Sequence, residues 1–322
     1  MIALQDIRDA STRIASRVHC TPVFGSSTLA QRAGVARFEL KCENFQKTGS
    51  FKVRGALNAL SQLDDDARSR GVVTVSAGNH AQALAWAARA AGIACTVVMP
   101  ETAARSKVDA STGYGATVIL HGTSADAFRK ARELADTDGF TFVHPFDDDR
   151  IIAGTGTVAL ELLEQTAPPD IVVVPIGGGG LIAGIAIAIK ESHPATRVIG
   201  VEPTGASVMR QSLDAGHAMR LESVNSIADG LAAPMAGEKT YEAVQRYVDD
   251  VVLVSDEEIA LAMEMLLSRC KLLAEGGGAA ATAALLAGRI PMRGTEHVVA
   301  ILSGGNVDLE RLLQLTHGAS CR

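Results

Sequence analysis

Aromatic residues are scarce in this chain, at 4% of its 322 residues, although hydrophobic residues make up 47%. The interior is therefore expected to be packed mainly with aliphatic side chains and alanine. A basic surface is also missing, since 30 lysines and arginines stand against 36 aspartates and glutamates, for a net charge of −6. The sequence thus gives no electrostatic reason to expect a nucleic-acid partner.

Long apolar runs and paired cysteines are missing as well. An apolar stretch such as residues 181–189 stops far short of a membrane span. The N-terminal MIALQDIRDAS has neither the basic start nor the apolar core of a signal peptide. The 5 cysteines are odd in number and scattered, without the spacing of a disulfide framework or of a C-x-x-C pair. No membrane partner is therefore expected, and a cytoplasmic location fits the free thiols.

Lys52, in the segment ENFQKTGSFKVRGA (43–56), has an unusual setting for a lysine. Ser50 is a candidate N-cap for a helix predicted from Phe51 to Leu63, so the first turn would hold an ammonium group among apolar neighbours. Positive charge is disfavoured at a helix N-terminus, and partial burial lowers the pKa of a lysine further. A lysine driven toward its neutral amine is suited to form a Schiff base. The alternative is a lysine whose stem packs on the helix start while its ammonium reaches water.

Four consecutive glycines, 177–180, follow an apolar β-branched run at 170–175 and precede a predicted helix that begins near Leu181. A strand, a glycine loop and a helix in this order aim backbone N–H groups and the positive end of a helix dipole at one anion. The glycines fit neither a dinucleotide G-x-G-x-x-G pattern nor the Gly-Lys-Ser/Thr ending of a P-loop. One compact phosphate is therefore predicted rather than a pyrophosphate, and the alternative is a flexible glycine turn.

A lysine suited to Schiff-base formation, together with a cradle for one phosphate, points to pyridoxal 5'-phosphate (PLP). Four motifs carry the same indication in order: SFKVRGA at 50–56, SAGNHAQ at 76–82, GGGGLIAG at 177–184 and SGGN at 303–306. These motifs resemble the serine/threonine dehydratase and serine racemase family of fold type II PLP enzymes. The resemblance extends from about Thr21 to Asn306, which is nearly the whole chain.

The resemblance implies a role for each motif. Lys52 matches the lysine that forms the Schiff base, and Phe51 matches a residue packed near the cofactor ring. Asn79 matches the side chain that hydrogen-bonds the 3'-oxygen of the cofactor, and Ser303 matches the hydroxyl that meets its pyridine nitrogen. The remaining implied positions are the phosphate cradle at Gly177, Gly178, Gly179, Gly180 and the amide of Leu181, the cofactor lining at Gly230 and Glu275, and the substrate-carboxylate loop at Ser76, Ala77, Gly78, Asn79 and His80.

A divalent-cation site is implied by the segment GVEPTGASV (200–208). The corresponding family loop binds Mg²⁺ or a similar cation through a glutamate, a backbone carbonyl and an aspartate. Glu202 and the carbonyl of Ala206 match the first two ligands, but Val208 stands in the place of the aspartate. Because hard cations prefer charged oxygen ligands, this loss weakens the predicted site. The alternative for Glu202 is a salt bridge at the end of a strand.

The chain is predicted to be an α/β protein of fold type II, with two parallel-sheet domains and the cofactor in the cleft between them. Residues 71–145 would form the small domain, and residues 1–70 and 146–322 the large PLP-binding domain, which includes the Lys52 helix. The predicted strands are 72–76, 94–99, 116–120, 140–144, 170–175, 197–201, 251–254 and 297–302, and the later helices are 79–91, 103–113, 124–136, 150–165, 181–191, 205–215, 256–269 and 278–287. The three aspartates at 147–149 are interpreted as a solvated turn.

The expected activity is that of a PLP-dependent ammonia-lyase (dehydratase), which converts a β-hydroxy amino acid, L-threonine or L-serine, to a 2-oxo acid and ammonia. Ser303 favours elimination, because beside a hydroxyl the pyridine nitrogen can stay neutral and the ring is a weaker electron sink. Two alternatives remain: an amino-acid (serine) racemase on the same scaffold, and a non-catalytic protein that binds PLP or a phosphometabolite. Ala77 disfavours the racemase, since the racemase branch carries a serine there as the acid and base of the opposite face.

The expected partners are a small amino-acid substrate and further copies of the chain, in a homodimer or higher homo-oligomer. About sixteen residues follow Asn306. The regulatory domain appended to biosynthetic threonine dehydratases is therefore not expected, and a catabolic or specialised role is favoured.

Overall fold

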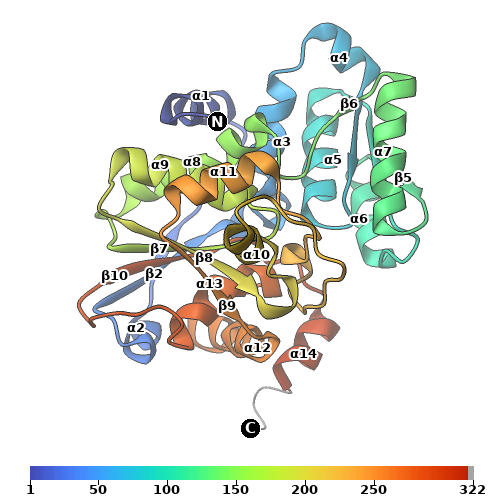
Figure 1. Cartoon of the computed structure of the whole chain (residues 1–322). Helices are drawn as coiled ribbons and strands as arrows, with labels where there is room; N and C mark the ends of the chain where they lie inside the picture. The colour runs from blue at the N-terminus through green and yellow to red at the C-terminus, as the bar shows by residue number, and fades with distance from the viewer. Residues whose placement is uncertain (318–322) are drawn as a thin grey trace.

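Two β-sheets organise the protein, whose computed structural model describes residues 1–317 (Figure 1). The larger sheet has six strands, all parallel except for the antiparallel pair β1–β2 at one edge. In spatial order its strands are β1 (Val23–Gly25), β2 (Arg37–Cys42), β10 (His297–Leu302), β7 (Ile171–Pro175), β8 (Arg197–Pro203) and β9 (Asp250–Val254). The smaller sheet is parallel, in the order β5 (Thr117–Leu120), β4 (Cys95–Met99), β3 (Val72–Val75) and β6 (Thr141–Phe142).

Helices connect most of the strands and cover both sheets. They are α1 (Leu4–Ile14), α2 (Ser27–Ala33), α3 (Lys52–Ser61), α4 (Asp65–Arg70), α5 (Asn79–Ala91), α6 (Arg105–Gly113), α7 (Ser124–Asp138), α8 (Asp149–Gln165), α9 (Gly180–Ser192), α10 (Val208–Ala215), α11 (Glu238–Tyr247), α12 (Asp256–Met265), α13 (Gly276–Leu286) and α14 (Leu309–His317). None of the helices within residues 1–317 combines the length and the apolar character that crossing a membrane requires.

Strand β10 shows why these segments form a sheet that is buried on both faces. Val298, Ala300 and Leu302 pack into the apolar cluster on one face, and Val299 and Ile301 pack into the cluster on the other. Because successive side chains of a strand point to opposite sides, a continuous apolar run suits a strand that helices cover twice. Helices α2, α12 and α13 cover the first face, and α1, α8, α9 and α11 cover the second (Figure 1).

Helix α3 lies between the two sheets. Its buried residues share one apolar cluster with α5 and with strands of the smaller sheet, and α3 also packs along α8 of the larger unit. The other face of the smaller sheet is covered by α7. The division of the chain into residues 71–145 and the remainder stays a prediction, since the helix that begins at Lys52 contributes to the core of the smaller sheet.

The predicted α/β architecture with two parallel sheets is confirmed. Helix 79–91 and strand 297–302 have the predicted limits, and the other predicted elements differ mainly at their ends. Strands β1 and β2, which extend the larger sheet, were not predicted from the sequence, nor were helices α1, α2, α4, α11 and α14. Strand β2 was hidden because Glu39 and Lys41 interrupt its apolar pattern. Both side chains are buried, and each is paired, with His297 and Glu161 respectively.

The prediction that Ser50 caps the Lys52 helix is wrong. Helix α3 begins at Lys52, and the residue before it, Phe51, already has helical backbone angles (φ −56°, ψ −21°). The hydroxyl of Ser50 is buried and has no hydrogen-bond partner within the described residues. Ser50 instead forms an isolated β-bridge with Gly304, so that the chain enters α3 from an extended segment.

The aspartates at 147–149 are not a solvated turn. Asp147 accepts hydrogen bonds from the amides of Lys239 and Thr240 at the start of α11. Asp148 accepts one from the amide of Arg150 at the start of α8. Carboxylates at helix N-termini satisfy amides that lack a partner within the helix, so this segment joins two helix starts beside the cleft described next.

Candidate active site

A cleft of about 660 Å³ opens where the carboxyl ends of strands from both sheets meet. In α/β proteins this edge of the sheet is the usual place for a ligand. All the predicted cofactor and substrate residues line this cleft: Phe51, Lys52, Ser76, Ala77, Gly78, Asn79, His80, Gly177, Gly178, Gly179, Gly180, Leu181, Gly230, Glu275 and Ser303. The fold therefore brings together segments that lie near opposite ends of the chain.

Lys52 is the first residue of α3, and its amine enters the cleft. Nζ donates a hydrogen bond to the carbonyl of Pro145, at 2.9 Å, and lies 5.1 Å from the ring centre of Phe51. Burial lowers the pKa of Lys52 to about 8, although the carboxylate of Glu275 opposes this shift. A fraction of the amine is therefore neutral near pH 7 to 8, which is the form that acts as a nucleophile or a base.

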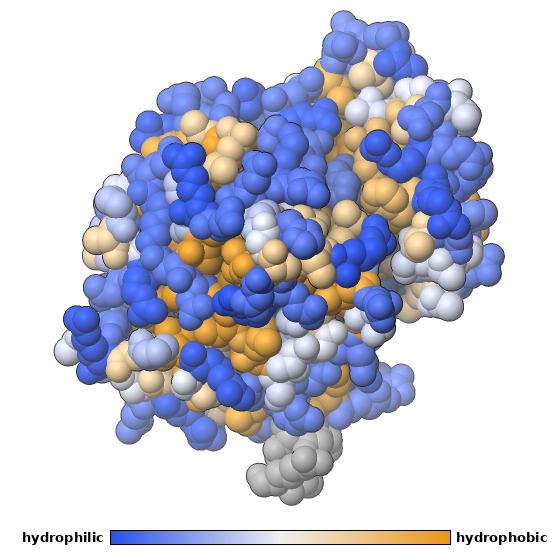
Figure 2. Space-filling view, in the orientation of Figure 1, coloured by the Kyte–Doolittle hydropathy of each residue, from blue (hydrophilic) through white to orange (hydrophobic). Residues whose placement is uncertain are grey.

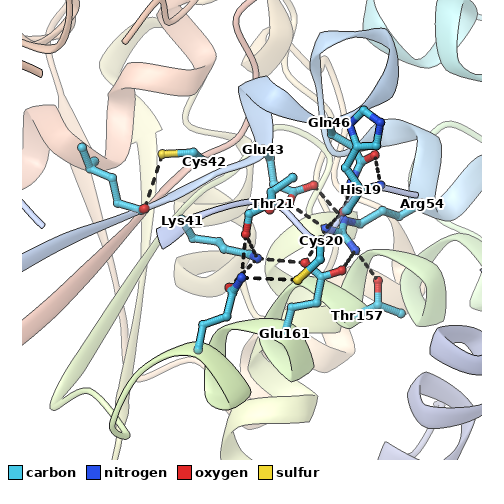
Figure 3. A network of polar contacts seen from close by, with 12 residues as sticks. His19, Cys20, Thr21, Lys41, Cys42, Glu43, Gln46, Arg54, Thr157 and Glu161 are labelled. Atoms are coloured by element: carbon cyan, nitrogen blue, oxygen red, sulfur yellow. Dashed lines mark hydrogen bonds and ion pairs between the residues drawn. The ribbon is translucent and has the colours of Figure 1, made fainter. Parts of the chain in front are cut away.

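A network of buried charges holds α3 from the side away from the cleft (Figure 3). The guanidinium of Arg54 makes two hydrogen bonds to Glu43, at 2.7 and 2.8 Å, and two to Glu161, at 2.7 and 2.8 Å. Lys41 donates to the same Glu161 at 2.8 Å. Burial opposes ionisation of Arg54, but Glu43 and Glu161 outweigh it and raise the pKa of Arg54. The network ties the end of β2, helix α3 and helix α8 together.

The glycine loop at 177–180 is shaped by the absence of side chains. A Cβ atom on Gly178 would lie 2.4 Å from ring atoms of Phe146, and one on Gly179 would lie 2.8 Å from Thr240. Gly179 has a φ of 94°, a conformation that glycine adopts without strain. The carbonyl of Gly178 accepts a hydrogen bond from Thr240 Oγ1, at 2.7 Å. Since Gly179 precedes α9 and has no capping side chain, the first amides of α9 remain available to an anion.

Asn79 and Glu275 meet in the lining of the cleft. Asn79 Nδ2 donates to Glu275 Oε1 at 2.6 Å, and Asn79 Oδ1 accepts a hydrogen bond from Asn306 Nδ2 at 2.8 Å. Burial raises the pKa of Glu275 to about 7, although the hydrogen bond from Asn79 opposes the shift. Ser303 is nearly buried, and its hydroxyl donates to the carbonyl of Gly277 at 3.3 Å.

The loop from Ser76 to His80 connects β3 to α5. The amide of Gly78 donates to Ser76 Oγ at 3.2 Å, and Gly78 precedes the helix without a capping side chain. His80 is buried in the first turn, where Nε2 lies 3.1 Å from Thr74 Oγ1 and Nδ1 has no hydrogen-bond partner among residues 1–317. Burial, with the charges of Lys52 and His144, holds the pKa of His80 well below its ordinary value. His80 is thus a neutral residue that anchors the loop to Thr74 of β3.

The segment from Val143 to Asp148 was missed as part of the site. It contributes the carbonyl of Pro145 that accepts from Lys52 and the ring of Phe146 that covers the glycine loop. His144 Nδ1 accepts from the amides of Phe146 and Asp147, which holds the turn. The two residues of this segment that contact Lys52 and the glycine loop are a proline and a phenylalanine, which do not by themselves indicate a site, so only the fold identifies them.

The family model described as "Pyridoxal-phosphate dependent enzyme" matches residues 14–304 of the chain. The chain belongs to this family. Within it, the chain is one of the fold type II PLP enzymes of the serine/threonine dehydratase and serine racemase group, as the motifs predicted.

Relatives in the family carry two kinds of name. The chain is 44% identical to the L-threonine dehydratase catabolic TdcB of Escherichia coli strain K12, over 98% of this chain and 96% of that protein. It is 44% identical to the L-threonine ammonia-lyase of Thermotoga maritima, over 97% of this chain and 77% of that protein. Among solved structures it resembles maize serine racemase, with a TM-score of 0.92 and 41% identity over 98% of this chain and 97% of that one. It also resembles the serine racemase of Dictyostelium discoideum, with a TM-score of 0.89 and 41% identity over 96% of this chain and 99% of that one.

The residues of the cleft fit PLP, the cofactor of this family. The four glycines of the loop line the cleft, and α9 begins there with amides that no capping side chain uses, as a bound phosphate requires. Lys52 supplies an amine with a lowered pKa. Asn79 and Ser303 supply neutral polar groups on the same cleft, as a ring with a 3'-oxygen and a nitrogen requires.

The predicted cation site is not supported by the structure. Glu202 is fully buried, and its carboxylate oxygens accept hydrogen bonds from the amides of Met209 and Arg210, at 2.7 and 2.8 Å. These amides belong to the first turn of α10, so Glu202 serves the start of a helix rather than a strand-end salt bridge or a cation. Ala206 and Val208 are buried apolar residues. Among the described residues, no group of three histidine, cysteine, aspartate or glutamate side chains is arranged to hold a metal ion.

Proposed function

We propose that this chain is a PLP-dependent ammonia-lyase that converts a β-hydroxy amino acid, L-threonine or L-serine, to a 2-oxo acid and ammonia. The observation that carries the proposal is the meeting of Lys52, whose pKa is lowered to about 8, with the glycine loop in one cleft. Relatives that share 44% of the sequence over nearly the whole chain are named threonine ammonia-lyase or threonine dehydratase.

The cofactor would be held by residues from both sides of the cleft. The loop 177–180 and the amide of Leu181 would bind its phosphate. Asn79 would donate to its 3'-oxygen and Ser303 would meet its pyridine nitrogen, while Gly230 and Glu275, which also line the cleft, would lie beside it. When bound, PLP supplies an electron sink for the charge that develops at the substrate α-carbon. The protein supplies orientation and the transfer of protons.

Lys52 is the base in this proposal. Its neutral amine removes the proton from the substrate α-carbon, and the positive end of α3 and the buried setting keep the resulting ammonium ready to release that proton. The loop from Ser76 to His80 binds the substrate carboxylate through its backbone amides and the Ser76 hydroxyl, at the start of α5. The carboxylate is thereby held so that the α-proton faces Lys52.

Ala77 distinguishes this proposal from a serine racemase. Racemisation requires an acid on the face opposite the base, because one lysine returns the proton to the face from which it came. The methyl group of Ala77 can neither donate nor accept a proton. Elimination is therefore proposed as the main outcome, although solved structures of serine racemases share the fold.

We further propose a homo-oligomer located in the cytoplasm. Large apolar side chains are exposed on the larger unit, among them Phe24, Phe45, Leu267 and Leu273. Apolar residues also gather over the middle of the face drawn in Figure 2 rather than being spread evenly. Such surface is often covered by another chain.

Cysteines that remain unpaired in the described part of the chain, such as Cys20, fit a reducing compartment.

The proposal is tested by incubating the purified protein and PLP with a panel of β-hydroxy amino acids and measuring the release of 2-oxo acid and ammonia. Lys52→Ala should lower turnover by about 10³-fold or more, because both the covalent attachment and the base are lost. Lys47→Ala is the matched control, since Lys47 is nearby but lies 5.3 Å above the Trp86 ring, away from the cleft.

Reduction with borohydride followed by peptide mapping should place the cofactor on Lys52. A label on another lysine would contradict the assignment of the site. Binding of PLP without release of 2-oxo acid from any member of the panel would favour the non-catalytic alternative.

A further inference from the structure

Asn306 ends the SGGN motif, yet it has no role in the proposed binding of PLP. It lies at the rim of the cleft, four residues after strand β10, and is exposed. Its Nδ2 group donates two hydrogen bonds, one to the carbonyl of Thr48 at 2.7 Å and one to Asn79 Oδ1 at 2.8 Å. Asn306 thus connects the segment before Lys52 with the loop that begins α5.

The carbonyl of Thr48 determines which end of the Asn306 amide faces inward. A backbone carbonyl can only accept, so Asn306 must present its NH₂ group to Thr48. Thr48 has a φ of 61°, in the left-handed region that non-glycine residues rarely adopt. The next residue, Gly49, leaves the space that Asn306 occupies, because a Cβ atom there would lie 2.2 Å from Asn306 Oδ1.

The orientation of Asn306 then decides the orientation of Asn79. The second N–H of Asn306 points to Asn79, so Asn79 must offer its oxygen in return. Its own NH₂ group is thereby turned to Glu275, to which it donates at 2.6 Å. An Asn79 amide turned the other way would place its oxygen against the carboxylate oxygen of Glu275 and its NH₂ group against that of Asn306.

We propose that Asn306 is a positioning residue, which orients the amide of Asn79 so that its NH₂ group, and not its oxygen, faces the 3'-oxygen of the cofactor. The inference rests on the proposed function, because it takes Asn79 as the donor to PLP. One N–H of Asn79 is used by Glu275, which leaves the second for the cofactor. A donor held in advance saves the cost of ordering it when the ligand binds.

The decisive variant is Asn306→Asp, which keeps the size of the side chain and replaces the donor by an acceptor. The aspartate would repel Asn79 Oδ1 and favour the reversed amide, which presents oxygen to the 3'-oxygen of PLP. We expect the affinity of the cofactor-free protein for PLP to fall about tenfold, as for the loss of one hydrogen bond to a charged group. The visible absorption band of the bound cofactor should shift as well, because its 3'-oxygen has lost a donor.

The control is Asn44→Asp. Asn44 also donates through Nδ2 to a backbone carbonyl, that of Leu273 at 3.1 Å, and its Cβ lies beside Gly305 of the same motif. Its side chain is not bonded to Asn79 within the described structure, so this variant should keep the affinity for PLP and the absorption band of the unmodified protein. The same chemical change at a neighbouring position therefore separates orientation of Asn79 from a general effect of added charge.

A double variant tests whether Asn306 acts through Asn79. Asn79→Ala alone should lower the affinity for PLP. The double variant Asn79→Ala/Asn306→Asp should bind PLP within about twofold of Asn79→Ala, since the effects of coupled residues are not additive. If Asn306→Asp does not fold, as judged by circular dichroism and thermal unfolding, Asn306→Ala replaces it in the same comparison.

Two results would overturn the inference: an Asn306 variant with the affinity and absorption band of the unmodified protein, or effects of the two substitutions that simply add. Failure of the proposed function looks different, because it is observed in the unmodified protein, as the absence of PLP on Lys52 or of 2-oxo acid release.

Discussion

The two sides of helix α3 differ in whether their buried charged side chains have partners of opposite charge. Behind the helix, Arg54 and Lys41 are fully buried, and each is matched by Glu43 or Glu161 (Figure 3). Facing the cleft, Lys52 has a backbone carbonyl as its hydrogen-bond partner, and no salt bridge within residues 1–317 involves it. Burial lowers the pKa of Lys52 to about 8, whereas the paired carboxylates raise the pKa of Arg54.

The difference separates charges that hold the fold from charges that can react. Groups with matched partners are kept ionised, and breaking such a pair leaves an uncompensated charge that is costly to bury. Groups without matched partners are driven toward the neutral form, which a base or nucleophile requires. Lys52 and Arg54 are separated by one position, Val53, so a single helical turn carries both kinds of environment.

The largest effect is expected from breaking the paired side. Arg54→Met should reduce the free energy of unfolding by about 3–5 kcal/mol, because Glu43 and Glu161 would lose their main partner. Urea unfolding of the cofactor-free protein measures this change. Arg70→Met is the control, since Arg70 pairs with Asp66 on the surface and should cost at most about 1 kcal/mol. Equal losses for the two variants would show that the buried network does not hold α3.

The next largest effect is expected on the affinity for PLP at the cleft side of α3, where the room around the glycine loop matters more than charge. Gly178→Val should weaken PLP binding about 100-fold, because its Cβ would lie 2.4 Å from the Phe146 ring and obstruct the loop. Cofactor titration measures the affinity. Gly113→Val is the control, since no described atom lies within 4 Å of a Cβ there, apart from its chain neighbours and the backbone of its own helix. Unchanged affinity in Gly178→Val would place the phosphate elsewhere.

Glu275 provides a test of the cleft side through pH. Burial raises its pKa from 4.5 to about 7, so the folded protein binds more protons than the unfolded chain between these values. The stability contributed by this group therefore falls as the pH rises from 4.5 through about 7. Glu275→Gln, which cannot ionise, should stabilise the cofactor-free protein above pH 7 by roughly 1–3 kcal/mol and have little effect below pH 4.5.

Glu39 is a buried glutamate that has charged as well as polar partners, whereas the hydrogen bond to Glu275 comes from the neutral Asn79. The contribution of Glu39 to stability should therefore change with pH in the opposite direction. Burial disfavours its ionised form, but hydrogen bonds from His297, Thr166 and Arg37 outweigh burial and lower its pKa. Its stabilisation is present above the unfolded pKa and is lost as the pH falls through the lower folded pKa. Glu39→Gln should therefore destabilise the protein at pH 7. Thermal unfolding of Glu39→Gln and Glu275→Gln across pH 4 to 8 measures both effects. If both substitutions changed the stability in the same direction at pH 7, the comparison would be refuted.

The smallest effect is expected from adding a hydroxyl to the cleft side. Ala77→Ser would provide a proton donor in the substrate loop, and the ratio of D-serine to pyruvate formed from L-serine should rise several-fold, as a partial general acid effect. Chiral chromatography measures the ratio. In the unmodified protein, D-serine formed as fast as pyruvate would instead support the racemase.

Much of the site could be predicted from short motifs because local sequence determines local backbone geometry. Four glycines between a buried strand and a helix indicate a loop without side chains, and a lysine at a helix start indicates a disfavoured charge. These signals, with the alternation of strands and helices, were sufficient for the α/β fold, and the family was named from the motifs themselves. Every predicted cofactor and substrate residue lines the same cleft.

The partners of the charged residues could not be predicted in this way. Glu202 matches a cation ligand by its position in the sequence, yet its carboxylate binds the amides that start α10. The aspartates at 147–149 look like a surface turn, yet they join the starts of α8 and α11. Sequence shows which groups carry charge, but not which groups lie opposite them after packing.

The sequence by itself therefore determined the parallel α/β architecture, the lysine and the glycine loop, because each depends on residues that are close together in the chain. Only the tertiary structure decided that Arg54 is a support and Lys52 is free to react, that Phe146 covers the loop, and that Asn306 reaches Asn79. These contacts join distant segments, such as those of Asn79 and Asn306, which are 227 positions apart. The physical reason is that burial and pairing determine the pKa and the orientation of a polar group, and both arise only when distant segments pack together.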